Sequence, residues 1–357
     1  MKIKVNSSEL NRMMKTISKC IGNRDMAYGN IEVIYDNNML TLRGTNGQFA
    51  AVMYTPVMGG DGETFGVDGE MFGKVCALCK GDVEIVTEGS SCIIRGAGRT
   101  RLPIVKANIP NFVRPDYDAS AKVLAQDFAK CFSSVEHAIC TDQSNARIAL
   151  TGVNVEIGDD SIKMVTLDGF MLAIESAKCS GEDAKMIVPG AFMRLIKDST
   201  VNGEEITLTT DGHRIMAQTE GMMIACPLLI SDFPDYNRIL PTDFRTECLV
   251  DADNLRTILK NSAVVCSANK LVKFEIEDNH IKISGNSEQA DYEAVLECET
   301  RGENLKIAFN LEYILDTIGS VGSEEIIMKF NTPSSPCVVR SKTAQGIRLV
   351  LPVRVMG

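Results

Sequence analysis

The side chains that most often perform catalysis are sparse in this chain. Its only histidines, His137, His213 and His280, stand far apart, on one predicted helix and two predicted turns. No two of them have the helical spacing that gathers imidazoles around a metal ion. We therefore expect no metal site, and we expect these rings to be solvent-exposed or hydrogen-bonded.

Cys76 and Cys79 form a Cys-x-x-Cys pair, a spacing that zinc and redox sites use. No second pair follows at zinc-site spacing, and the stretch has the pattern of an apolar helix face, which favours core thiols. Most of the 12 cysteines lie in apolar runs and show no disulfide framework. Buried free thiols are typical of a reducing cytosol, so we expect a cytoplasmic protein.

Signatures of nucleotide binding and acyl transfer are also missing. Gly96-Ala-Gly98 lacks the strand–loop–helix setting of a dinucleotide site, and the chain has no Walker lysine and no serine nucleophile elbow. The carboxylate pairs Glu204-Glu205 and Glu324-Glu325 precede predicted strands and resemble solvated turns. The residues thus favour a protein without a catalytic site or a cofactor.

One arrangement of elements occurs three times along the chain. An apolar helix pattern, a strand, a turn and a second strand begin at Val67, Val188 and Phe309, so consecutive copies start 121 residues apart. Recurrence at a fixed period is the signature of repeated structural units.

The other half of each copy repeats as well. Each copy opens with an amphipathic helix that has polar capping residues at its start. A hairpin with a polar tip follows, and the tips are Asp36-Asn37-Asn38, Gly158-Asp159-Asp160 and Asp278-Asn279.

We therefore predict an α+β chain of three tandem domains, each with two helices and roughly eight short strands. Polar, proline-containing linkers place the domains at residues 1–118, 121–242 and 246–357. The predicted helices are residues 8–24, 69–81, 125–140, 189–200, 252–266 and 310–320.

The formal net charge of −10 alone argues against contact with nucleic acid. The predicted helices, however, carry 11 Lys and Arg against 8 Asp and Glu, so the rest of the chain carries −13. An acidic body with less acidic helices suits a protein that meets phosphates only on a helical face. Helix surfaces also tolerate Lys and Arg in general, and the charge pattern leaves both interpretations open.

Several stretches carry a family resemblance that covers the whole chain in order. They are FPDYNRILP at Phe233–Pro241, VTLDGFMLA at Val165–Ala173, the helix and strand from Asn310 to Phe330, and the C-terminal LVLPVRVMG. With these stretches and its threefold repeat, the chain resembles the bacterial DNA polymerase processivity clamp, the beta sliding clamp family.

That resemblance implies a non-catalytic DNA replication factor. It implies a ring-shaped, head-to-tail homodimer of which one chain forms half, with helices lining the hole and sheet outside. Such a ring encircles double-stranded DNA without sequence specificity and makes synthesis processive. The DNA polymerase and the clamp loader would bind it through short linear motifs, and no membrane would take part.

The resemblance also implies a partner-peptide pocket between the second and third domains. An apolar groove with a few polar anchors suits a short peptide that carries Leu or Phe. The residues carried over are Leu150, Leu167, Gly169, Phe170, Met171, Leu172, Pro234, Arg238, Ile239, Asn310, Tyr313, Ser335, Leu349, Leu351, Pro352, Val353 and Arg354.

Two further residue sets follow from the same resemblance. Residues expected to approach or attract DNA are Arg24, Gln143, Lys15, Lys19, Lys130, Lys197 and Lys260. Residues expected at the dimer interface are Leu102 and Ile104 of one protomer against Val265 and Cys266 of its partner.

The chain departs from the family pattern beside the pocket. Phe170-Met171 follow Asp-Gly where the family often has His-Arg, which should make the pocket more apolar. A TDGHR stretch does occur at Thr210–Arg214, but the repeat register places it at a hairpin tip, and we interpret it as a turn. The tail also runs on by Met356-Gly357, which could cover one edge of the pocket.

Two other functions stay open from the residues alone. A nucleotide- or sugar-processing enzyme built on a repeated α+β domain would need an acid–base pair in one copy, and none is evident. A repeat scaffold that binds proteins without DNA is opposed, weakly, by the cations Lys15, Lys130 and Lys260 on the three opening helices.

No apolar run approaches the ~18–20 residues of a membrane helix.

Overall fold

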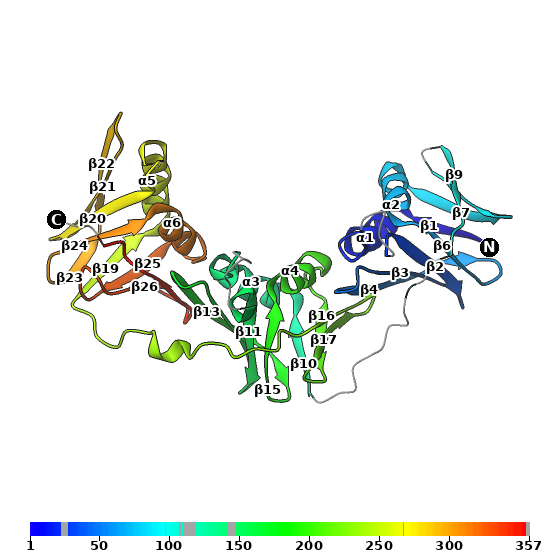
Figure 1. Cartoon of the computed structure of the whole chain (residues 1–357), viewed down its shortest axis with the longest axis horizontal. Coiled ribbons are helices and arrows are strands. Elements are labelled where there is room, and N and C mark those ends of the chain that lie inside the picture. Colours follow the sequence, from blue (N-terminus) through cyan, green and yellow to red (C-terminus); the bar gives the residue numbers. More distant parts are fainter. Residues whose placement is uncertain are drawn as a thin grey trace. The chain divides into compact units, whose positions relative to one another are not determined.

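The computed structural model describes residues 1–22, 28–96, 98–106, 109, 119–141, 148–266 and 268–354 (Figure 1). The chain forms two compact units. The first unit comprises Met1–Phe128, Ile157–Asp160 and Cys179–Leu229, and the second comprises Ala129–Glu156, Ser161–Lys178 and Ile230–Gly357.

The same order of elements recurs three times, as the sequence predicts. The first copy is β1 (Lys2–Asn6), α1 (Ser7–Ile17), β2 (Asn30–Asp36), β3 (Met39–Thr45), β4 (Ala50–Pro56), β5 (Met58–Gly59), β6 (Glu63–Asp68), α2 (Gly69–Leu78), β7 (Asp82–Glu88), β8 (Ser91–Arg95) and β9 (Arg99–Pro103). The second is β10 (Ala119–Leu124), α3 (Ala125–Val135), β11 (Gly152–Gly158), β12 (Ser161–Leu167), β13 (Met171–Lys178), β14 (Ser180–Gly181), β15 (Ala184–Pro189), α4 (Gly190–Ser199), β16 (Glu205–Thr210), β17 (Arg214–Thr219) and β18 (Met222–Pro227). The third is β19 (Thr246–Asp251), α5 (Ala252–Val265), β20 (Leu271–Glu277), β21 (His280–Asn286), β22 (Asp291–Glu297), β23 (Glu299–Gly302), β24 (Leu305–Asn310), α6 (Leu311–Gly319), β25 (Glu325–Phe330), β26 (Cys337–Ser341) and β27 (Ile347–Val350).

Within the described residues each copy thus has two helices and nine strands, against the roughly eight strands predicted. The additional strand is the short fifth one, β5, β14 or β23, which has only two to four residues. A strand of that length shows too little alternation to stand out in a sequence. The 3₁₀ turns η1 (Glu136–Ala138), η2 (Ile148–Thr151) and η3 (Tyr236–Arg238) complete the described elements.

The helices begin within one residue of the predicted positions but end earlier than expected. Asp68, Asp251 and Asn310 each accept a backbone N–H of the first turn, from Met71, Asn254 and Glu312 respectively. The helix predicted to reach residue 24 ends at Ile17, because Lys19 and Cys20 donate to Thr16 and Ile17 in tight three-residue turns. Similarly, α3 ends at Val135 and passes into η1.

The polar hairpin tips are confirmed. Asn37 and Asn38 both have positive φ, 49° and 61°, and Asp159 and Asp160 have 52° and 55°. Two consecutive left-handed residues make the type I′ turn, whose twist matches that of the flanking strands, and Asn and Asp tolerate this conformation best.

The first unit contains two antiparallel sheets with the orders β5-β1-β7-β8-β9 and β14-β10-β16-β17-β18-β4-β3-β2-β6. The second of these sheets joins two copies, because β18 pairs with β4. Helices α1 and α2 lie side by side in this unit (Figure 1). Their buried faces include Leu10, Met13, Ile17 and Phe72, none of which exposes any surface.

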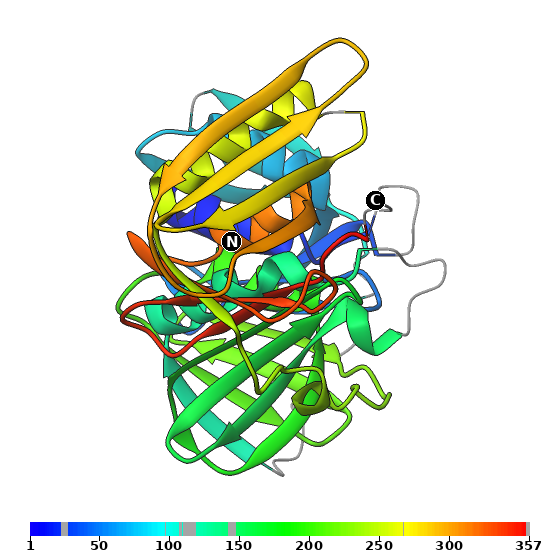
Figure 2. The same ribbon diagram turned by 90° about the vertical axis from the view of Figure 1, so that its left-hand side faces the viewer.

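The second unit repeats this plan with later elements. Strands β11, β12, β13, β27, β26, β25, β19 and β23 are neighbours in that order, and β22-β21-β20-β24 form a further sheet. Figure 2 shows β20, β21 and β22, in yellow to orange, lying across α5. Here β27 of the third copy pairs with β13 of the second, so each junction between copies is a strand pair.

The thiols behave as the sequence predicts. All 12 cysteines are free, and ten of them are buried, including Cys76 and Cys79. Burial raises the pKa of Cys20 to about 12, because a thiolate would lose its hydration there. In the described part of the chain no helix is both long and apolar enough to cross a membrane.

Candidate functional site

A tight turn between β12 and β13 presents an aromatic side chain to solvent. The Asp168 carboxylate accepts the backbone N–H groups of Phe170 (2.7 Å) and Met171 (2.6 Å), and Gly169 takes φ 101° at the bend. Burial raises the pKa of Asp168, although these two N–H groups favour its charged form. The turn leaves Phe170 53% exposed while Met171 is buried.

Phe170 does not stand alone, because it stacks on Tyr313 of α6. The ring centroids are 5.4 Å apart and the planes differ by 24°. The N-cap of α6 holds Tyr313 in place, since Asn310 accepts the Tyr313 N–H at 3.4 Å. Two residues predicted from distant segments therefore form one half-exposed aromatic pair.

An apolar cluster lies beside this pair at the β13–β27 junction. Its buried members are Leu150, Val165, Leu167, Leu172, Tyr236, Val338 and Leu349, and Ile239 and Leu351 are partly buried members. The junction itself pairs Leu172 with Leu349. The structure thus brings together side chains from three stretches that carry the resemblance, Val165–Ala173, Phe233–Pro241 and the C-terminal stretch from Leu349.

Hydrogen bonds within residues 234–239 fix the turn that this segment contributes to the site. Asp235 accepts the N–H of Asn237 at the start of η3, and the Tyr236 hydroxyl donates to Glu156 at 3.1 Å. Pro234 is half-buried, whereas the Arg238 side chain is 86% exposed and pairs with Asp235. Arg238 is therefore free to turn toward a ligand at little cost.

Backbone bonds hold the C-terminal tail along this site. Leu351 N–H donates to Phe170 O (2.9 Å) and Val353 N–H donates to Ala308 O (2.8 Å). Pro352 forms an isolated bridge with Phe309. Val353 and Arg354 are exposed, and Ser335 is half-buried. Met356 and Gly357 lie outside the described residues, as do the contacts expected of them.

A cavity of about 350 Å³ opens next to the tail. Its lining combines apolar and charged side chains: Phe274, Ile307, Ala308, Pro333 and Val353 with Lys273, Glu275 and Lys306. A volume of this order holds one or two side chains of a peptide.

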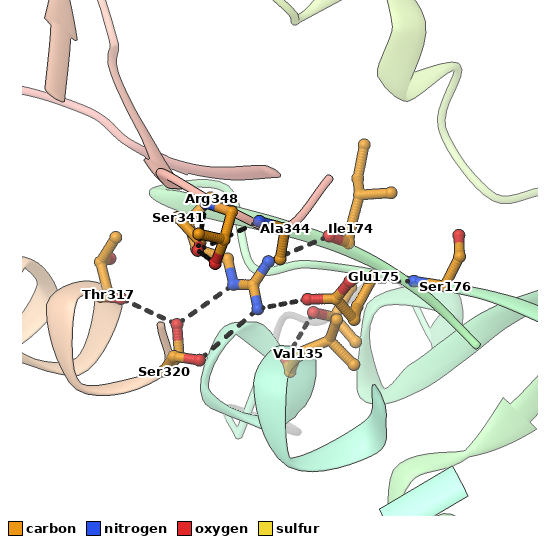
Figure 3. A network of polar contacts seen from close by, with 11 residues as sticks. Val135, Ile174, Glu175, Ser176, Thr317, Ser320, Ser341, Ala344 and Arg348 are labelled. Atoms are coloured by element: carbon orange, nitrogen blue, oxygen red, sulfur yellow. Dashed lines mark hydrogen bonds and ion pairs between the residues drawn. The ribbon is translucent and has the colours of Figure 1, made fainter. Parts of the chain in front are cut away.

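A buried arginine, which the sequence analysis missed, ties the junction to α6 (Figure 3). Arg348 is 3% exposed and donates to the Glu175 carboxylate at 2.8 Å, to Ile174 O at 3.2 Å and to Ser320 Oγ at 3.3 Å. These partners fix β13, β27 and α6 against one another. An arginine in an alternating strand pattern reads as solvent-facing, so no sequence signal pointed to it.

Other residues that the sequence analysis missed are Phe233, Tyr236 and Val338 of the apolar cluster. Two of them lie inside the FPDYNRILP stretch that carried the resemblance. Their aromatic side chains beside a polar turn were the available signal.

His137 corrects an expectation from the sequence. We expected it to be exposed or hydrogen-bonded, but both ring nitrogens are buried and have no hydrogen-bond partner among the described residues. Burial, and then the nearby charge of Arg348, lower the pKa of His137 to about 4. The ring is therefore neutral at pH 7. In the described residues no three His, Cys, Asp or Glu side chains gather as metal ligands would.

The cations expected to face DNA lie on or just after the helices. Lys15, Lys19, Lys130 and Lys260 are exposed, and Lys197 is half-buried. Lys19 pairs with Asp198 at 2.6 Å, so part of its charge is neutralised. Arg24 and Gln143 fall outside the described residues.

The observed helix ends also weaken the charge argument. The described helices α1–α6 carry eight Lys and Arg against seven Asp and Glu, a net charge of +1 rather than the predicted +3. The difference arises because α1 ends before Lys19 and Arg24 and α2 ends before Lys80, while α3 ends before Glu136. Local lysines, rather than a strongly basic helical face, must supply any attraction to phosphates.

The four expected interface residues differ in exposure. Leu102 is 5% exposed and Cys266 is fully buried within their own units, whereas Ile104 and Val265 are half-buried. The neighbouring Val264, which the sequence analysis did not name, is 81% exposed. Of these five described residues, Ile104, Val264 and Val265 have surface to offer a partner.

Two sheet edges stand out by their charge. At the end of its sheet, β9 presents exposed Arg99 and Arg101. At the edge of the other unit's sheet, β22 presents exposed Asp291, Glu293 and Glu297, with Val295 58% exposed. Each edge strand has one side without a ladder partner among the described strands.

Two family models match most of the chain. The central domain of the DNA polymerase III beta subunit matches residues 122–235, and the C-terminal domain of that subunit matches residues 237–354. Among curated proteins, the beta sliding clamp of Streptomyces coelicolor is 23% identical over 299 residues, or 79% of each chain. That of Vibrio cholerae is 20% identical over 369 residues, covering 99% of this chain and 100% of the relative.

Solved structures share the fold over nearly the whole length. The DNA polymerase III beta subunit of Thermotoga maritima has a TM-score of 0.92 at 24% identity, covering 99% of this chain and 100% of its own. A Pseudomonas aeruginosa sliding clamp bound to griselimycin has a TM-score of 0.93 at 20% identity with the same coverage. At these identities the likeness establishes the α+β fold.

Proposed function

The chain belongs to the DNA polymerase III beta subunit family, and from that premise we propose that it is a ring-forming sliding clamp. Two chains join head to tail around double-stranded DNA, and the ring tethers the replicative polymerase and other partners. The work is done by tethering alone, because a partner held on the ring gains effective concentration at the DNA without any bond being made.

The convergence at the β13–β27 junction supports this proposal most directly. Leu172 and Leu349 form a floor, the Phe170–Tyr313 pair forms a half-exposed wall, and Arg238 lies at the rim. A short peptide with Leu or Phe anchors can bury its side chains there and leave quickly, as exchange between partners requires. The other pocket residues that the resemblance implies remain part of this proposal.

The two charged edge strands support head-to-tail assembly. A basic edge at β9 and an acidic edge at β22 are complementary between two chains but would repel their own kind. If β9 of one protomer pairs with β22 of its partner, both exposed edges gain a ladder and Val295 becomes buried. Each chain carries one basic edge and one acidic edge. Two chains can therefore make the β9–β22 contact twice, which closes a ring of two chains.

DNA would meet this ring through phosphates only. Lys15, Lys130 and Lys260 provide exposed cations, and no recognition helix with base-reading side chains is needed. Contacts of this kind are weak and independent of sequence, so the ring would slide.

A topology assay tests the proposal. The protein, loaded onto nicked circular DNA with its clamp loader, should co-elute with the DNA and should be lost once a restriction enzyme linearises it. Retention that is equal on circular and linear DNA, or that depends on base sequence, would refute encirclement. A light-scattering mass of one chain at micromolar concentration would refute the dimer.

A further inference from the structure

The β4–β18 junction in the first unit repeats the β13–β27 junction of the second. Ala50 pairs with Ala225 in the first junction, and Leu172 pairs with Leu349 in the other. In each junction this pair lies three residues after the glycine of the preceding turn, which is Gly47 or Gly169, and the β13–β27 ladder already begins at Met171. Ala50 and Leu172 therefore hold the same position relative to the turn that precedes their strand.

The turns that precede β4 and β13 are also built alike. Asn46 accepts the N–H groups of Gln48 (2.9 Å) and Phe49 (2.7 Å), and Gly47 takes φ 88°. Asp168 accepts the N–H groups of Phe170 and Met171 in the same pattern, with Gly169 at φ 101°. The same backbone turn therefore precedes the strand at both junctions.

The side chains differ, and the difference leaves space. Where one junction is filled by Leu172 against Leu349, the other has Ala50 against Ala225. A cavity of about 310 Å³ remains there, and both alanines line it. Its other lining side chains include Tyr28, Phe49 and Pro227. Aromatic and proline surfaces of this kind accept a flat or branched apolar side chain.

The cavity also carries two arginines and no lining carboxylate among the described residues. Arg43 is 17% exposed and pairs with Glu32 at 2.8 Å. Arg214 is exposed and pairs in the β17–β18 ladder with Pro227, and no carboxylate hydrogen-bonds to it in the described structure. A guanidinium so placed can take a carboxylate in two parallel hydrogen bonds.

Arg214 belongs to the TDGHR stretch that the sequence analysis set aside as a turn. The structure confirms the turn, since Asp211 accepts the N–H groups of His213 (2.9 Å) and Arg214 (2.6 Å), and Gly212 takes φ 75°. The Asp211 carboxylate therefore accepts hydrogen bonds from these two backbone N–H groups. Arg214 itself is exposed and lines the cavity, and its charge helps to lower the pKa of Asp211.

We infer that the β4–β18 junction is a second peptide-binding site, which takes a short segment with one carboxylate next to an apolar or aromatic side chain. The carboxylate sits on Arg214, and the apolar side chain enters between Tyr28, Phe49 and Pro227. This site does not depend on whether the β13–β27 junction binds partners. A clamp with both sites would hold two partner segments on each chain.

Photo-crosslinking with peptide mapping tests this inference. The probe is acetyl-Glu-Leu-Ser-Leu-(4-benzoylphenylalanine) amide, in which Glu supplies the one carboxylate; it is irradiated with the full-length protein, and the adducts are located by mass spectrometry. Adducts within residues 44–50 and 214–227 are expected, in addition to any at 167–172 and 349–354. Arg214→Gln should lower the first set at least about tenfold, as loss of a charge-assisted bond predicts, and Arg214→Lys should lower it less.

The controls separate the two sites. A probe with Gln in place of Glu should lose the adducts at residues 44–50 and 214–227 and keep those at 167–172 and 349–354. Arg238→Gln should leave the adducts at 44–50 and 214–227 unchanged. Adducts confined to the β13–β27 junction would overturn this inference while leaving the proposed function intact. Adducts at residues 44–50 and 214–227 that survive both Arg214→Gln and the Gln probe would overturn recognition of the carboxylate. Because Arg214 is exposed, its replacement does not threaten the fold, which circular dichroism would verify.

Discussion

The guanidinium of Arg348 lies 2.8 Å from the carboxylate of Glu175, and the two residues belong to different copies of the repeat. Arg348 is 3% exposed and the Glu175 side chain 18%, so this is a buried ion pair inside a strand junction. With Ser320 of α6 it fixes the junction that carries the proposed peptide pocket.

Removing the arginine should destabilise the second unit. Arg348→Met leaves the half-buried Glu175 without its partner, and we expect a loss of about 3 kcal/mol in the free energy of unfolding, measured by urea titration. Arg348→Met combined with Glu175→Gln should recover part of that loss. The exposed pair Arg238–Asp235 is the control, and Arg238→Met should change stability by less than about 0.5 kcal/mol. Equal effects at the two sites would contradict the assigned role of burial.

The Phe170–Tyr313 pair should govern peptide affinity more than stability. Phe170→Ala removes a half-exposed ring, so the melting temperature should hardly move while affinity for a fluorescent Gln-Leu-x-Leu-Phe peptide falls about tenfold. Phe170→Tyr retains the stacked face and should bind like the wild type. If Phe170→Ala binds equally well in fluorescence anisotropy, the partner site lies elsewhere.

The dimer should depend on the charged edge strands. Arg101→Glu should shift the assembly toward monomers through like-charge repulsion with β22 of the partner, and adding Glu293→Arg should restore dimers. Val295→Asp should have the same dissociating effect, since it would bury an unpaired charge. Size-exclusion chromatography with light scattering reports the mass.

Leu102 and Cys266 are unsuitable for that test, because each is buried within its own unit and a charge there would damage the fold. Ile230→Asp is the matched control, as Ile230 is 72% exposed and lies on neither edge strand. Dimers that persist in the Arg101→Glu and Val295→Asp variants would rule out pairing of β9 with β22.

His137 should make stability fall in mild acid. Its pKa is about 4 in the folded chain against the ordinary 6.5, so the unfolded chain binds the extra proton first as the pH falls. Stability is therefore fully present above pH 6.5 and declines as the pH falls toward 4, by about 3 kcal/mol in total. His137→Leu should flatten this part of the profile in urea titrations between neutral pH and pH 5. A profile with the same slope in both proteins would contradict the buried, neutral imidazole.

The exposed lysines should control DNA affinity without regard to sequence. Replacing Lys15, Lys130 and Lys260 by Gln should weaken binding to every duplex by a similar factor and reduce its dependence on salt. Lys19→Gln should matter less, because Asp198 already offsets that charge. Lys306→Gln, at an exposed lysine of β24, is the control and should have no effect in anisotropy titrations. A loss that varies with base sequence would contradict sliding.

The sequence by itself determined the features that depend on neighbours along the chain. The order of elements in three copies followed from periodicity, and Asp251 marked the start of its helix. Asn37 and Asp159 marked hairpin tips, because only a few residue types accept a left-handed backbone. The sequence did not predict the short fifth strands, and it placed the helix ends too late, since each of these features rests on one or two local hydrogen bonds.

The tertiary structure alone decided what the strand junctions contain. Arg348 and Glu175 are 173 residues apart, and no local pattern distinguishes a buried arginine in a strand from a solvent-facing one. His137 was likewise expected to be exposed or hydrogen-bonded, but the fold buries its ring nitrogens near the charge of Arg348. Leu172 against Leu349 fills one junction and Ala50 against Ala225 leaves a cavity in the other. Burial and free volume depend on which distant side chains meet, and that depends on the register of strands far apart in the chain.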